Sequence, residues 1–336
     1  MATAATSAPD PIWSPTREAI LQACPRRYFY HYYLSSGGWS PGASEAARHA
    51  YRLRQLTTLD LVLGTAIHRC ANLLARAIVA RRARPDLVEL RNRSRAALNQ
   101  AWKESRDRAA FLRDPGRRAM LLPVYYRRGI SQAAVERIRT KLDSCLPNLL
   151  ECSLWTLVER PSTSIHVGEA PVRLDVRGVP IWAAPDLIVR PATGQPVLIE
   201  WKTGRIDRGQ AEKQVMAYGL FLRDGLHVPP EKGGYNGAIV DLLRGEVETI
   251  PIREPELSAA EDRIWHGYAA MRRLLVPGTS QPKEMAEFPL ATRRANCPHC
   301  NFWEICEVRH QGLGPSPRLP DPAHDRSGGA AGSSTG

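Results

Sequence analysis

The sequence predicts an α/β fold, in which a mixed sheet is flanked by helices and carries a basic helical insertion and a C-terminal cysteine cluster. Two patterns support this class. Apolar residues recur at helical spacing in the first half of the chain, and short strand-like runs bounded by turn residues follow. The chain has 336 residues and 43% apolar content, which permits one large core or two small ones. We expect one core.

The N-terminal segment, residues 1–56, is expected to contain an aromatic-rich helix at residues 14–34. Ser14 can cap its first turn, and Pro15 suits the first helical position because the N–H that proline lacks would be unpaired there. Pro25 should interrupt this helix. A stretch rich in glycine and serine then separates the segment from the core.

Residues 57–80 are expected to form the first core helix, with His68 near its start. Its apolar residues fall on one face at intervals of three or four: Ile67, Ala71, Leu74 and Ile78. Such a face is buried against a neighbouring element, so we assign this helix to the core.

Residues 81–150 are interpreted as a basic helical insertion. Arginine accounts for 14 of the 53 residues from Arg76 to Arg128, and acidic residues are few. The arginines could bind phosphates, and three aromatic residues could stack on bases of a single strand: Trp102, Tyr125 and Tyr126. A solvated basic helix face explains the same composition equally well.

The rest of the core is expected within residues 151–290. Three strand runs should form a meander, separated by Arg-Gly and Ala-Thr-Gly-Gln turns: residues 164–176, 180–189 and 196–202. A helix should follow Thr203-Gly204, then two more strands and a long helix at residues 255–275. Strands followed by alternating helices and strands indicate a mixed sheet with helices beside it.

The charge of the chain favours a polyanionic partner. The formal net charge is +12 and the isoelectric point is about 9.7, so a polyanion would be concentrated at the surface. Nucleic acid is the first candidate, and an anionic membrane surface is the alternative. We find no apolar run of about 18 residues that could span a bilayer, and the first residues lack the features of a secretory signal. A cytoplasmic protein without a membrane partner is therefore expected.

Two carboxylates and an amine stand out in the strand region. Glu200 and Lys202 occupy positions i and i+2 of one strand, so both project from the same face. Asp186, after Pro185, can lie beside them on the neighbouring antiparallel strand, because a turn containing Gly194 joins the two strands. Paired carboxylates repel unless a hard cation lies between them, which suits Mg²⁺ or Mn²⁺. A surface Glu/Lys pair gives the same short pattern, so the interpretation depends on Asp186.

Two motifs flank these residues: Gly64-x-x-x-His68 upstream and Gln214-x-x-x-Tyr218 downstream. In this order, the set resembles the PD-(D/E)XK nucleases, in particular the RecB-like branch that includes the AddB nuclease and a CRISPR-adaptation nuclease family. The resemblance extends over residues 14–308. It implies a restriction-endonuclease-like core and the hydrolysis of DNA phosphodiester bonds.

The resemblance also implies a role for each motif residue. His68 would join Asp186 and Glu200 as a ligand of Mg²⁺ or Mn²⁺, and Lys202 would position the attacking water. The other two residues would support the active site and the nucleic acid strand: Gln214 and Tyr218. Without the resemblance, a lone helical histidine is more often packed or exposed, and the Gln/Tyr pair merely marks one helical face.

Four of the seven cysteines suit a metal or cluster site that joins residues 291–311 to the N-terminal segment: Cys24, Cys297, Cys300 and Cys306. Four thiolates suit zinc or iron, and His299 with His310 offers a zinc site without Cys24. In iron-sulfur members of the branch, one cysteine precedes the nuclease motifs and three follow, so the resemblance implies a structural 4Fe-4S cluster. The remaining cysteines are expected in the core: Cys70, Cys145 and Cys152.

Together these expectations describe a metal-dependent DNA nuclease, an exonuclease of repair, recombination or defence that acts on DNA with single-stranded character. The sequence has no G-x-x-x-x-G-K-[ST] phosphate loop, so any helicase would be a separate partner. The alternatives are a non-cutting DNA-end binding or scaffolding module and a zinc-dependent nucleic-acid adaptor. Residues 312–336, rich in proline, glycine and serine, are expected to form a disordered tail.

Overall fold

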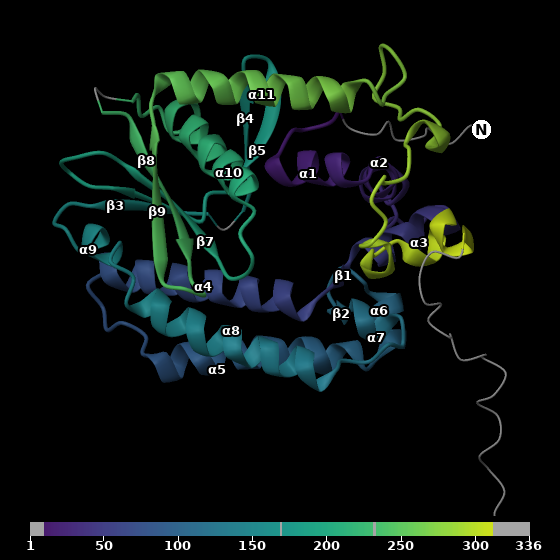
Figure 1. Cartoon of the computed structure of the whole chain (residues 1–336), viewed down its shortest axis with the longest axis horizontal. Coiled ribbons are helices and arrows are strands. Elements are labelled where there is room, and N and C mark those ends of the chain that lie inside the picture. The colour runs from purple at the N-terminus through teal and green to yellow at the C-terminus, as the bar shows by residue number, and fades with distance from the viewer. Residues whose placement is uncertain (1–9, 169, 231–232, 312–336) are drawn as a thin grey trace, which may run out of the picture.

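The computed structural model describes residues 10–168, 170–230 and 233–311. Its centre is a five-stranded sheet in the order β3-β6-β7-β8-β9 (Figure 1). The strands are β3 (Ser164–Val167), β6 (Leu187–Arg190), β7 (Val197–Lys202), β8 (Tyr235–Asp241) and β9 (Glu246–Ile252). The β7–β8 pair is parallel and the other three pairs are antiparallel. The predicted α/β class with a mixed sheet is confirmed.

Helices cover both faces of this sheet (Figure 1). One face carries α10 (Arg208–Leu220) and α11 (Glu254–Arg272), and the other carries α4 (Leu59–Val79), α5 (Leu87–Ser105) and α8 (Gln132–Leu150). Adjacent residues of β7 point to opposite faces, so Leu198 packs in the first layer and Ile199 in the second. The strand is therefore apolar on both sides, as a central strand must be.

The predicted meander is wrong in one respect. The run at residues 180–189 is two strands, because β5 (Val179–Ala183) pairs with β4 (Val172–Val176) in a separate hairpin, while β6 joins the sheet beside β3. The break falls at Ala184-Pro185, where proline has no N–H for a ladder hydrogen bond. The predicted Arg-Gly turn does join β4 and β5, with φ of 51° at Arg177 and 79° at Gly178.

The N-terminal helix has the predicted interruption. Ser14 caps α1 (Pro15–Ala23) through a hydrogen bond from the Arg17 N–H to Ser14 Oγ, and α2 (Pro25–Phe29) begins at the expected proline. A π-helical turn, η1 (Tyr30–Leu34), follows.

The shorter elements are α3 (Glu45–Arg54), β1 (Leu56–Thr57), α6 (Arg108–Arg113), β2 (Met120–Leu121), α7 (Leu122–Tyr125), α9 (Trp155–Val158), η2 (Phe221–Gly225), η3 (Met285–Glu287), η4 (Cys297–His299), η5 (Trp303–Ile305) and η6 (Glu307–Gln311). The helices predicted as an insertion at residues 81–150 share a buried cluster with α4 and the sheet. The proposed division of the chain into six segments stays a prediction, and the predicted tail at residues 312–336 lies outside the described residues.

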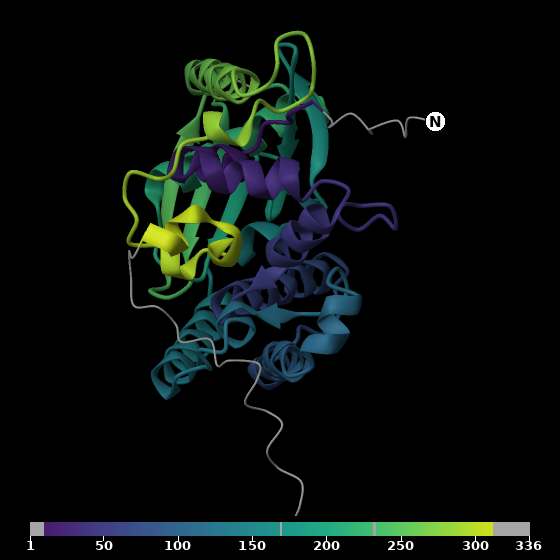
Figure 2. The same ribbon diagram turned by 90° about the vertical axis from the view of Figure 1, so that its right-hand side faces the viewer.

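Segments from opposite ends of the chain lie side by side, with the yellow C-terminal segment against the purple N-terminal helices (Figure 2). The Arg26 side chain donates from Nε to the Phe288 carbonyl at 2.8 Å and from Nη1 to Glu307 at 2.8 Å. The Arg26 backbone N–H donates to the carbonyl of Pro289 at 3.1 Å. A third buried cluster contains residues from both segments, among them Tyr30 and Phe302.

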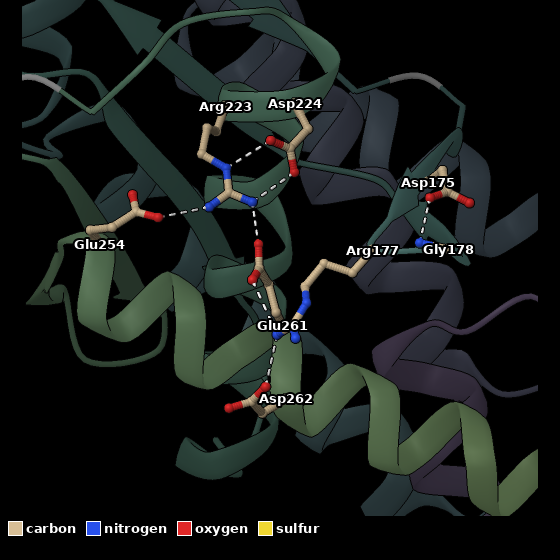
Figure 3. Close-up of polar contacts among 8 residues, drawn as sticks. All are labelled: Asp175, Arg177, Gly178, Arg223, Asp224, Glu254, Glu261 and Asp262. Atoms are coloured by element: carbon tan, nitrogen blue, oxygen red, sulfur yellow. Dashed lines mark hydrogen bonds and ion pairs between the residues drawn. The ribbon is translucent and has the colours of Figure 1, made fainter.

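A network of ion pairs ties α11 to the two elements beside it (Figure 3). Arg223, in η2, donates to the carboxylates of Asp224, Glu254 and Glu261. Arg177, in the hairpin turn, pairs with Asp262 at 2.9 Å. Networks of this kind stabilise more than isolated surface pairs, so the hairpin and η2 are fixed to one helix.

One helix among the described residues, α4, is long and apolar enough to cross a membrane by length and composition alone, with mean hydropathy 1.2. Polar residues such as His68 and Asn72 interrupt it, which is why it does not stand out as an unbroken apolar run. Its Leu63, Ile67 and Leu74 are buried in the cluster shared with α8 and the sheet. This is the position of a core helix.

We predict that Gly237→Ala lowers the free energy of unfolding by about 1–3 kcal/mol, because overpacking forces α10 away from β8. A Cβ at this position would lie 2.3 Å from Val215 Cγ1 of α10 and 3.3 Å from the Ile250 carbonyl. Denaturant unfolding measures the change. The matched control is Gly42→Ala, where a Cβ would have no heavy atom within 4 Å. Equal losses in the two variants would contradict the tight packing of α10.

Candidate active site

The ends of two strands bring the predicted carboxylates and amine together. Leu187 of β6 pairs with Ile199 of β7, so Asp186, one residue before β6, lies opposite Glu200. The backbone N–H of Trp201 donates to Asp186 Oδ2 at 2.9 Å and fixes this carboxylate at the end of β7.

The amine of Lys202 donates hydrogen bonds to two protein side chains. Its Nζ donates to Glu200 Oε1 at 2.7 Å and to Gln214 Oε1 at 2.6 Å. The Tyr218 hydroxyl donates to the other oxygen of Glu200, Oε2, at 2.6 Å. Gln214 and Tyr218 lie one turn apart on α10, so this helix carries two of the contacts that define the site.

His68 reaches the site from α4. Its Nδ1 lies 3.0 Å from Asp186 Oδ1. One turn earlier, Gly64 lets the helix pass close to the end of β7, because a Cβ at this position would lie 3.3 Å from Thr203 Oγ1. The structure therefore brings together all six residues that the sequence analysis placed in the metal and catalytic site.

The contacts within the site shift the pKa values of three of its residues. Burial and the neighbouring charge of Asp186 raise the pKa of Glu200 to about 7. Burial lowers the pKa of His68, but its hydrogen bond with Asp186 and the charges of Asp186 and Glu200 outweigh that effect, so the pKa lies above its usual value. Burial and the charge of Glu200 raise the pKa of Tyr218, which stays a neutral donor.

These residues fit a hard divalent cation by donor chemistry. The His68 imidazole contacts the Asp186 carboxylate, and the pKa of Glu200 is raised by burial and by the nearby charge of Asp186. In this conformation, Glu200 directs its oxygens to Lys202 and Tyr218. No three His, Cys, Asp or Glu side chains within the described ranges are arranged as a finished metal site.

A cavity of about 500 Å³ opens beside Gln214 and Tyr218. Thr16, at the start of α1, and Ala184, just before β6, line it together with the indole of Trp182. Motif reasoning did not find this cavity. The sequence feature that could have indicated it is the alternation of residues in β5, which places the large aromatic side chain of Trp182 on the less buried face of the hairpin.

The four predicted cluster cysteines lie within electrostatic reach of one another. Cys24 lies between α1 and α2, where its Sγ accepts a hydrogen bond from the Arg27 N–H at 3.4 Å. Burial raises the pKa of the other three thiols, and the nearby charge of Cys24 adds to the increase in each: Cys297, Cys300 and Cys306. The side chain of His310, an alternative zinc ligand, lies outside the described residues. The other three cysteines are buried, as expected: Cys70, Cys145 and Cys152.

Two aromatic residues proposed to stack on bases are not available for that role. Tyr125 and Tyr126 are buried, and their hydroxyls donate to the Glu304 carboxylate and the Asn301 carbonyl, both at 2.7 Å. They join the first half of the chain to the cysteine segment. Trp102 is 41% exposed and lines a cavity of about 470 Å³ between α5 and α8.

Comparison with known proteins identifies the family of the chain. A sequence model of the PD-(D/E)XK nuclease superfamily matches residues 12–307. No curated protein matches the chain. Seven chains of solved structures match, and one, described as "Crystal structure of SSO0001", has 17% sequence identity and a TM-score of 0.28, with 62% of this chain and 82% of that chain covered. Because the superfamily match spans most of the sequence, the chain belongs to the PD-(D/E)XK nuclease superfamily.

Proposed function

We propose that this protein is a metal-dependent nuclease that hydrolyses DNA phosphodiester bonds where β6 and β7 meet α4 and α10. Membership of the PD-(D/E)XK nuclease superfamily supports this reaction and the use of Mg²⁺ or Mn²⁺. The observation that carries the proposal is the placement of Lys202 Nζ, which lies 2.7 Å from Glu200 Oε1 and 2.6 Å from Gln214 Oε1. A solvent-exposed Glu/Lys pair would lack the second partner.

Each residue has a role that its contacts support. Asp186, Glu200 and His68 would hold the Mg²⁺ or Mn²⁺ ion, because they supply hard oxygen and nitrogen donors. When bound, the ion lowers the pKa of water and neutralises charge on the phosphoryl oxygens. Lys202 Nζ positions the attacking water, and its contact with Gln214 fixes the direction of the amine. The Tyr218 hydroxyl holds Glu200 in place.

We further propose an exonuclease of the RecB/AddB-like branch that acts in the cytoplasm in DNA repair, recombination or defence. The order of the Gly64–His68 and Gln214–Tyr218 motifs around the carboxylates supports this branch. The net charge of +12 supports DNA as the substrate, and single-stranded character is part of the proposal. A helicase would be a separate chain.

The four clustered cysteines are proposed to bind a 4Fe-4S cluster, with zinc as the alternative. Cys24 comes from one end of the described chain and the other three thiols from the opposite end, and the contacts of Arg26 hold these ends together. A cluster at this junction would act as a structural clasp rather than as a participant in DNA hydrolysis.

Lys202→Ala is expected to reduce DNA cutting at least about 100-fold, because the amine that positions the attacking water is lost. The assay measures degradation of labelled single-stranded and double-stranded DNA with Mg²⁺, Mn²⁺ or chelator. The control is Lys283→Ala, a partly exposed lysine in the loop after α11. An unaltered protein that binds DNA but cuts neither substrate with either ion would establish the non-cutting scaffold instead.

Binding of Mn²⁺ should depend on pH. Glu200, whose pKa is about 7, and His68, whose pKa lies above its usual value, must each lose a proton to bind the ion, so affinity should fall as the pH falls below about 7. Each released proton contributes about tenfold per pH unit, so the loss should lie between about tenfold and about a hundredfold per unit. Mn²⁺ titrations followed by electron paramagnetic resonance between pH 5.5 and 8 measure this. Affinity that stays constant over this range would exclude Glu200 as a ligand.

Cys24→Ser should remove most of the iron and acid-labile sulfide from protein purified without oxygen, because one of four cluster ligands is lost. Elemental analysis measures both. Cys152→Ser is the matched control, since this cysteine is buried and lies outside the cluster. Zinc in place of iron in the unaltered protein would establish the zinc alternative.

A further inference from the structure

The cavity beside the candidate active site has the size and lining of a nucleobase site. Its volume of about 500 Å³ is within the range of small-ligand sites in proteins. Pro15, Pro171 and Ala217 supply aliphatic surface, and Trp182 supplies an aromatic ring. Among the described residues, the lining contains no lysine, arginine or acidic residue, so a flat uncharged ring is a better occupant than a phosphate.

Two links connect this cavity to the catalytic residues. Gln214 lines the cavity and also accepts the hydrogen bond from Lys202 Nζ at 2.6 Å. Ala184 lines it as well, and Asp186 follows two residues later in the chain. A base in the cavity therefore belongs to a nucleotide next to the phosphate that is cut.

The β4–β5 hairpin adds a cation to the same surface. Arg173 lies directly opposite Trp182 in the ladder, and residues opposite one another project from the same face. The other face of the hairpin is buried in the core through Val176 and Ile181. Arg173 is exposed, and it has no hydrogen bond or ion pair with any other described residue. An aromatic ring beside an unpaired cation is the chemistry that binds single-stranded nucleic acid.

We propose that this cavity receives one unpaired base of the strand being cut, with Trp182 stacked on the base and Arg173 bound to a backbone phosphate. This inference rests on the proposed nuclease function and deepens it. A base that is paired in a duplex cannot enter the cavity, so the substrate is a single strand or a frayed end.

The first test measures binding and does not require cutting. A single-stranded oligonucleotide that contains 2-aminopurine is titrated with the full chain in chelator, and stacking on an indole quenches its fluorescence. The unaltered protein and Trp182→Phe are expected to quench, because both retain an aromatic ring. Trp182→Ala should lose the quenching. The control, Trp265→Ala, removes a tryptophan that is 53% exposed on α11, and it should quench as the unaltered protein does.

The second test asks whether Trp182 acts through the base. With the unaltered protein, one abasic residue in the oligonucleotide should slow cutting at an adjacent phosphate by about 5- to 150-fold, the range expected for the loss of one base–aromatic stack. Trp182→Ala should slow cutting of the normal strand by a similar factor. This variant should cut the abasic strand at nearly the same rate as the normal strand, because the stack is already lost. A merely structural role for Trp182 would leave the abasic effect unchanged.

The outcomes separate the two proposals. If no DNA is cut, the nuclease proposal fails, and the fluorescence titration still decides the base site. If DNA is cut but Trp182→Ala quenches as strongly as Trp265→Ala, or abasic positions are cut at the normal rate, the base site is wrong while the nuclease stands. Normal quenching and cutting by Trp182→Phe show that an aromatic ring suffices at this position, and denaturant unfolding of Trp182→Ala shows whether that variant folds.

Discussion

The buried carboxylate of Glu200 is the constraint on which the rest of the site depends. It is only 3% exposed, and a carboxylate removed from water is costly unless charged or polar partners surround it. Lys202 supplies the charge from the same strand, and Tyr218 supplies a hydroxyl from α10. Because one partner comes from a helix, α10 must stay packed on the sheet, and the close approach of Val215 to Gly237 serves the site as well as the fold.

Much of the site could be predicted from the sequence because its geometry is local. The two-residue period of a strand places Glu200 and Lys202 on one face, and the four-residue spacing of a helix does the same for Gln214 and Tyr218. The hydrogen bond of Lys202 to Glu200 is the direct outcome of the strand period. The contacts of Gln214 and Tyr218 with β7 depend on how α10 packs on the sheet, and the place of His68 beside Asp186 depends on how α4 crosses it.

The features that the sequence did not predict depend on partners far away in the chain. Ala184-Pro185 interrupts a run of apolar residues. The run alone does not predict that β5, the strand before this break, pairs outside the central sheet. The burial of Tyr125 and Tyr126 depends on a segment 175 to 179 residues away, in which the Glu304 carboxylate and the Asn301 carbonyl accept hydrogen bonds from their hydroxyls. Periodicity in the sequence predicts that a helix or strand has an apolar face, but it does not predict which element packs against that face.

The contacts of Arg26 can form only late in translation. Its partners, Phe288 and Glu307, follow it by 262 and 281 residues, whereas every residue of the candidate active site lies at or before Tyr218. A chain still attached to the ribosome can therefore pair β6 with β7 and dock α10 while α2 waits, partly uncovered, for a segment that has not yet been translated. Closing so long a loop is costly in entropy, and exposed apolar surface on an unfinished chain invites aggregation. The segment that contains Phe288 and Glu307 thus covers α2 only after the active-site residues have been made.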